Sequence, residues 1–101
     1  MRGMTLRAGP LEHDATLPDG TLVHVRIGIP DDGYIRAKDI ETVTVELSGR
    51  GEHLAAVNTI LEPDQADEAL LLLRQIVDGL ESGALAPTAS AIAPLADTLP
   101  A

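Results

Sequence analysis

The chain has 101 residues, 45% of them hydrophobic, yet it contains no phenylalanine, tryptophan or cysteine and a single tyrosine. Sixteen acidic residues against seven lysines and arginines give a net charge of −9, which disfavours direct binding to nucleic acid or to an anionic membrane. The lack of cysteine excludes disulfides, thiolate nucleophiles and cysteine-bound metal centres. The composition therefore predicts one small domain with an aliphatic core.

Hydrophobic runs in this chain are short. The longest covers residues 69–73, far less than a membrane span requires. No apolar run follows the early arginines at positions 2 and 7, so the start of the chain does not resemble a secretory signal. We therefore expect a cytoplasmic protein with no membrane contact.

Three turn-forming clusters, rich in proline, aspartate and glycine, divide the first sixty residues at 18–20, 30–33 and 48–51. Hydrophobic and polar residues alternate at 23–29 and at 40–47, which is the period of a strand with one buried face. Residues 54–61 predict a third strand, whose two faces are nearly equal in apolar content. A fourth, less regular strand is expected at 11–17, before the first turn.

A long helix is predicted from Glu62 to Gly83. Pro63 suits the first helical turn, and Gly83 suits its end. One stripe of the helical wheel is apolar and is expected to pack on the sheet; it comprises Ala66, Ala69, Leu70, Leu73, Ile76, Val77 and Leu80. The same segment holds six of the acidic residues and one arginine, and most of these charges lie opposite the stripe.

The last eighteen residues differ sharply from the helix before them, with seven alanines, three prolines and a single charge. Because proline interrupts helices, we expect residues 84–101 to form an extended tail, disordered or docked on a partner, after a single domain at 1–83. The predicted fold is α+β: a three- to four-stranded antiparallel meander sheet with one long helix packed on one face.

Several hydrophobic residues are candidates for contact with a partner. Leu71 falls within the acidic arc of the predicted helix, and Leu72 lies on its flank. Tyr34, the only aromatic residue, follows a turn glycine, where tyrosine often anchors an interface. In the tail, one short helical turn would present three apolar side chains together: Ile92, Leu95 and Leu99.

The three histidines are the candidates for metal binding or acid–base chemistry near neutral pH. His24 lies on the outward face of its predicted strand, and His53 follows Glu52 at the start of another. If the strands pair in order, these residues could converge with Glu52 or Glu46 as a nitrogen and oxygen metal site on the open sheet face. Ser48 and His53 flank one turn, but the sequence contains no nucleophile motif around them.

The leading hypothesis is a small acidic, non-enzymatic interaction or accessory protein that acts through protein–protein contacts, as a homodimer or as a subunit, without a cofactor. Nearly all apolar residues are needed for folding, which leaves little for an enclosed pocket. The alternative is a small-ligand or metal-binding protein, or an enzyme, that uses His24 and His53. A third hypothesis is mimicry of nucleic acid by the acidic helix.

Overall fold

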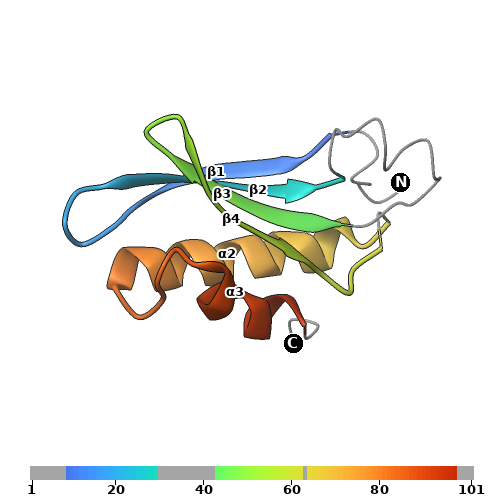
Figure 1. Ribbon diagram of the computed structural model, residues 1–101. Coiled ribbons are helices and arrows are strands. Elements are labelled where there is room, and N and C mark those ends of the chain that lie inside the picture. Colours follow the sequence, from blue (N-terminus) through green and yellow to red (C-terminus); the bar gives the residue numbers. More distant parts are fainter. Residues whose placement is uncertain (1–8, 30–42, 63, 98–101) are drawn as a thin grey trace.

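The computed structural model describes residues 9–29, 43–62 and 64–97. Within them lie four strands, β1 (Leu11–Thr16), β2 (Leu22–Gly28), β3 (Thr44–Gly49) and β4 (Glu52–Asn58), and two helices, α2 (Ala66–Ser82) and α3 (Ala89–Ala96). The strands form an antiparallel sheet in the order β1-β2-β3-β4, with both helices on one face (Figure 1). This confirms the predicted α+β class, the meander order and the long helix packed on the sheet.

Alternation of side chains along the strands places the core on the helix side of the sheet. Val25 of β2 pairs with Leu47 of β3, and both are fully buried. In β4 the inward residue is Ala55, which pairs with Leu47, whereas Leu54 is 40% exposed on the other face. Only one face of β4 is buried among the described residues, which settles the register that the sequence left open.

Two tight turns fix the register of the hairpins. In the first, Leu17 donates its N–H to the Thr21 carbonyl at 2.8 Å, and the Thr21 N–H donates to the Asp19 carboxylate at 2.9 Å. In the second, Gly49 pairs with Glu52, so the loop consists of Arg50 and Gly51, both with positive φ (55° and 78°). Two-residue loops of this handedness match the twist of the strands that they join.

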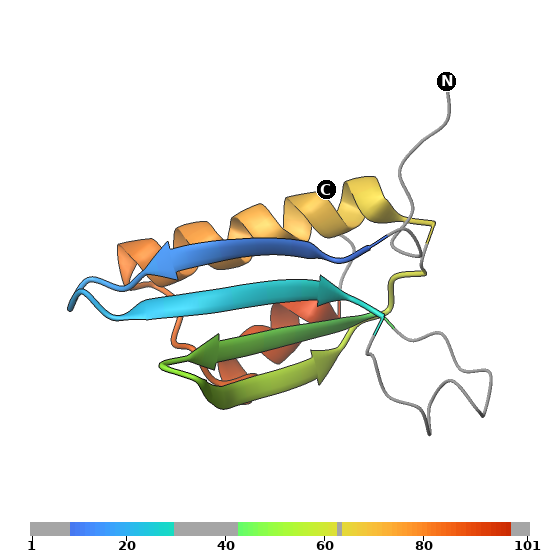
Figure 2. The ribbon, with the colours of Figure 1, turned by 90° about the horizontal axis from the view of Figure 1, so that it is seen from above.

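Helix α2 ends with a recognisable cap at Gly83, whereas its N-cap residue, Gln65, makes no side-chain hydrogen bond to the first turn. Before it, the Glu62 N–H donates to the Gln65 side-chain oxygen at 2.8 Å, and after it Gly83 adopts the left-handed conformation with φ of 83°. The helix packs mainly over β1 and β2, while α3 packs over β4, so the two helices lie side by side on the sheet (Figure 2). No helix among the described residues is long and apolar enough to cross a membrane.

The segment after Gly83 differs from the expected extended tail. Residues 89–96 form α3, whose first turn is capped by the Thr88 hydroxyl, which accepts the Ala91 N–H at 3.3 Å. Pro94 lies inside this helix, so proline did not prevent it. The physical reason is burial: Ile92 is fully buried and joins the core formed by the sheet and α2. Residues 84–97 are therefore packed on the domain.

Candidate functional site

The edge of the sheet at β1 is the most distinctive surface among the described residues. Among the described residues, β1 pairs with β2 alone, and α2 runs in the same direction on the helix side of the sheet, offset toward the outer edge of β1 (Figure 2). An edge strand presents backbone N–H and C=O groups that can pair with another strand. The candidate site is built on this edge.

The turn that follows β1 shows which backbone groups point outward. The Leu17 N–H donates to the Thr21 carbonyl across the turn. In an antiparallel pair of strands, every second residue forms backbone hydrogen bonds to the neighbouring strand. Counting back from Leu17, Ala15 and His13 therefore bond to β2. The N–H and C=O groups of Glu12, Asp14 and Thr16 therefore point away from the sheet. The Thr16 N–H confirms this direction because it donates to the Glu81 carboxylate of α2 at 3.4 Å.

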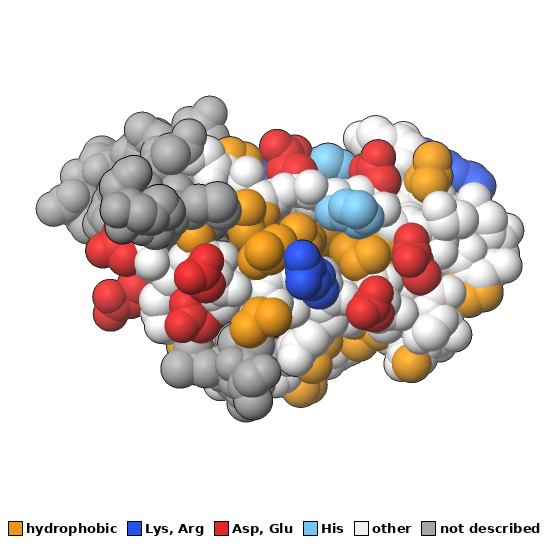
Figure 3. Space-filling model, turned by 180° about the vertical axis from the view of Figure 1, so that it is seen from behind, with side chains coloured by type: hydrophobic (Ala, Val, Ile, Leu, Met, Phe, Trp, Pro, Cys, Tyr) orange, Lys and Arg blue, Asp and Glu red, His pale blue; other side chains and the backbone are white. Residues whose placement is uncertain are grey.

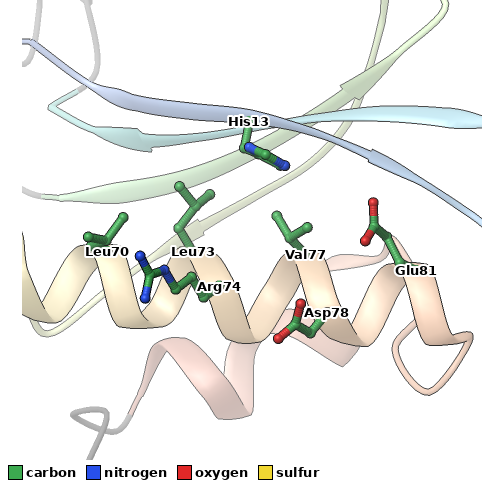
Figure 4. A pocket seen from close by; sticks show the side chains of 7 residues that line it. All are labelled: His13, Leu70, Leu73, Arg74, Val77, Asp78 and Glu81. Carbon is green, nitrogen blue, oxygen red and sulfur yellow. The ribbon is translucent and has the colours of Figure 1, made fainter.

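A groove of about 480 Å³ lies between β1 and α2. Figure 3 shows this side of the molecule, where hydrophobic side chains gather around one basic side chain and acidic side chains flank them. Figure 4 shows how the groove is built: Leu73 and Val77 point from α2 toward β1, and His13 projects from β1 above them. The full lining is His13, Leu70, Leu73, Arg74, Val77, Asp78 and Glu81.

The charge around this edge is mainly negative. Asp78 and Glu81 line the groove with Arg74. Glu12 and Asp14 project from β1 on the opposite face of the sheet, because they pair with Arg26 and His24 rather than with the buried residues of β2. Four carboxylates therefore stand close to the outer edge of β1, with Arg74 on the helix side and with Arg26 and His24 on the open face.

His24 lies between two of these carboxylates. Its Nδ1 is 2.7 Å from Asp14 Oδ1, and its Nε2 is 2.7 Å from Glu12 Oε1. Ionised carboxylates only accept hydrogen bonds, so both ring nitrogens must donate and the imidazole carries a positive charge in this arrangement. The hydrogen bonds that the ring donates to these carboxylates raise the pKa of His24 above its usual value, and the bond to Asp14 has the larger effect.

The residues proposed for a metal site are not brought together. His24 uses both nitrogens on Glu12 and Asp14, so neither is available as a metal ligand. His53 lies on β4 and pairs with Ser48 of β3, which separates it from His24 on β2. Glu52, at the start of β4, pairs with Gly49. The described residues contain no group of three acidic, histidine or cysteine side chains that could hold a metal ion.

A second, smaller hollow of about 170 Å³ lies on the open face of the sheet, where Ser48 and Arg50 stand near His24. Ser48 pairs with His24 in the ladder, and Asp14 bonds the far side of the same ring. An acid, a histidine and a serine in this sequence of contacts would resemble a catalytic triad. However, His24 Nε2, which would have to accept the serine proton, already donates a hydrogen bond to Glu12. This arrangement therefore does not activate Ser48.

The candidate partner residues differ in how far they are exposed in the structure. Leu71 is 41% exposed on α2, as the wheel indicates, and Leu95 is partly buried against the core. Leu72 and Ile92 are fully buried in one core cluster, because α3 extends the apolar contact of α2 around its flank. They are part of the fold and present no surface in this chain. Tyr34 and Leu99 lie outside the described residues.

Sequence reasoning missed the groove, although a signal for it was present. Leu11, His13 and Ala15 share one face of β1, and His13 is the polar member of that face. A polar residue at an inward position of an edge strand indicates that the core ends there. The offset between β1 and α2, which opens the groove, is a tertiary property that periodicity does not encode.

Comparisons with protein-family models, with curated proteins and with solved structures found no match to this chain. Its function has to be inferred from the geometry and chemistry described above.

Proposed function

We propose that this protein is a non-enzymatic binding module that takes up an extended segment of another protein as an additional strand along β1. The supporting observation is that no strand in the described part of the chain pairs with the outer edge of β1, which runs beside the groove between β1 and α2. In such strand addition, backbone hydrogen bonds provide affinity, and pockets for alternate side chains provide specificity. Both elements are present along β1.

The pairing that we propose uses the outward groups of Glu12 and Asp14. A strand bonded to them places every second side chain on the helix side of the sheet, because side chains alternate along a strand. Those side chains would enter the groove above Leu73 and Val77. A volume of about 480 Å³ falls within the usual range of protein binding sites.

The opposite edge of the sheet is less suited to this role. β4 contains a bulge where its register with Leu47 and Ser48 shifts, and bulges discourage further pairing. Beyond its end, the Ile60 N–H donates to the Ala96 carbonyl of α3 at 3.4 Å. β1, in contrast, keeps an unbroken register over six residues.

A proline substitution tests the proposal directly. Glu12→Pro removes an outward N–H without removing a hydrogen bond between β1 and β2, whereas Glu12→Gln keeps that N–H. Peptides of twelve random residues, displayed on phage, are selected on the full chain. We expect selected peptides to shift the amide resonances of Glu12 and Asp14 and to lose at least tenfold in affinity with Glu12→Pro but not with Glu12→Gln.

Two results would overturn the proposal. One is a selection that gives no binder, or binders that shift resonances only away from β1 and the groove. The other is equal affinity of the selected peptides for both Glu12 variants, once circular dichroism has shown that both are folded.

A further inference from the structure

The acidic side chains along β1 indicate the chemistry of the segment that binds there. We infer that this segment alternates lysine or arginine with aliphatic residues, an inference that rests on the proposed strand addition. Its basic residues lie on the open face of the sheet beside Glu12 and Asp14, and its aliphatic residues enter the groove.

The alternation follows from the geometry of pairing. Residues that pair across two strands share a face of the sheet. A residue opposite Glu12 or Asp14 therefore lies on the open face next to a carboxylate. The residue between them, opposite His13, lies on the helix side, next to the buried side chains of Leu73 and Val77.

The local charge favours a basic occupant over a neutral one. Glu12 and Asp14 share the protonated imidazole of His24, and Arg26, which pairs with Glu12 in the ladder, bonds Glu46 at 3.3 Å. These five side chains together carry one excess negative charge. On the helix side, the groove is lined by two acidic residues, Asp78 and Glu81, and by one basic residue, Arg74. The end of the groove at Asp78 and Glu81 therefore also favours a cationic side chain.

The same charges oppose the most direct alternative, a second copy of this chain. Antiparallel pairing of β1 with itself about a two-fold axis at residue 12, 13 or 14 sets Glu12 against Glu12, Glu12 against Asp14, or Asp14 against Asp14. Like charges directly opposite each other destabilise a pair of strands. The net charge of −9 on each copy adds to this repulsion.

Three synthetic peptides of nine residues separate the possibilities. Each alternates valine with one other residue, which is lysine, serine or glutamate. Dissociation constants are measured on the full chain from the amide shifts of Glu12 and Asp14. We expect each carboxylate that faces a lysine to increase the affinity of the lysine peptide by about two- to fivefold over that of the serine peptide. The glutamate peptide should bind least tightly.

Matched variants assign that preference to the two carboxylates. The double variant Glu12→Gln, Asp14→Asn should lose most of the preference for the lysine peptide over the serine peptide. The control is a second double variant, Glu52→Gln, Asp97→Asn, which removes the same amount of charge far from β1. It should keep the preference for the lysine peptide. If the first variant does not fold, the wild type still provides a test: raising the salt from 0.05 to 0.5 M should reduce the preference for lysine, because salt screens exposed charges.

The outcomes distinguish this inference from the proposed function. If the serine or glutamate peptide shifts the β1 amides with equal or higher affinity, strand addition stands and the basic partner is wrong. If no peptide shifts those amides, both are wrong. Concentration-dependent dimerisation of the free chain that Glu12→Pro abolishes would show that the occupant is a second copy, and would also overturn the inference.

Discussion

His24 joins β1 to β2 through charged side chains on the open face of the sheet. Because Asp14 and Glu12 each accept a hydrogen bond from its ring at 2.7 Å, the protonated form is favoured in the folded protein over the unfolded chain. While both bonds are made, neither ring nitrogen has a free lone pair for a proton or a metal ion. In this structure His24 therefore links β1 to β2.

This role predicts a pH dependence of stability. The pKa of His24 is raised in the folded state, so its contribution is fully present below the unfolded value of about 6.5 and is lost as the pH rises through the folded value. The side chain is 41% exposed and screened by solvent, so the contribution is at most about 1 kcal/mol. We expect urea unfolding to show a stability difference between wild type and His24→Gln at pH 6 that disappears by pH 9. A difference that is constant, or larger at pH 9, would contradict this role.

At the scale of elements, the regular part of the fold could be predicted and the rest could not. Val23, Val25 and Ile27 alternate with polar residues, and the apolar residues of α2 recur every three or four positions. Each pattern arises because one face of the element is buried against the rest of the domain. α3 has no comparable pattern. It buries Ile92 and Ala96 among alanines and a proline, and its packing depends on space beside α2 that only the assembled fold provides.

The candidate site shows the same division. The helical wheel predicts that Leu71 is exposed, because that follows from the periodicity of α2. It does not predict that Leu72 is buried, because a second helix covers that flank. The pairing of His24 with Glu12 and Asp14 depends on the register of β1, whose pattern of alternation is irregular in the sequence.

A substitution in α3 tests whether the segment after Gly83 belongs to the domain. Ile92 is fully buried, so Ile92→Ala removes buried methyl and methylene groups and should lower the free energy of unfolding by about 2–5 kcal/mol. Ser90→Ala, at an exposed position of the same helix, serves as a control with an expected change within about 0.5 kcal/mol. Chemical denaturation measures both. Equal stability of the two variants would mean that α3 does not pack on the sheet.

At the scale of the whole molecule, most of the large aliphatic side chains that the structure describes lie between the sheet and the helices, whereas Leu22, Leu54, Ile60 and Leu71 are exposed. A chain of this size has little left with which to enclose a pocket. A groove between an edge strand and a helix needs no interior cavity, because the backbone of β1 and the flank of α2 already stand beside each other. The fold thus has a groove at the edge of its sheet without a cavity in its core.

Net charge contributes at the same scale. A charge of −9 opposes the approach of a second copy and favours the approach of a basic molecule, over a distance that salt controls. The acidic residues beside β1 would direct this attraction toward the outer edge of the strand, which has outward backbone groups and an apolar groove beside it. Charge and backbone geometry therefore favour the same class of partner.

Amide hydrogen exchange along β1 tests the central claim most directly, because it reports each backbone N–H separately. In the free protein, we expect the amides of Glu12 and Asp14 to exchange rapidly and those of His13 and Ala15, which bond to β2, to exchange slowly. Adding the peptide that alternates valine with lysine should slow the first pair at least tenfold. Protection of Glu12 and Asp14 in the free protein, or rapid exchange of both when the peptide is bound, would contradict the account.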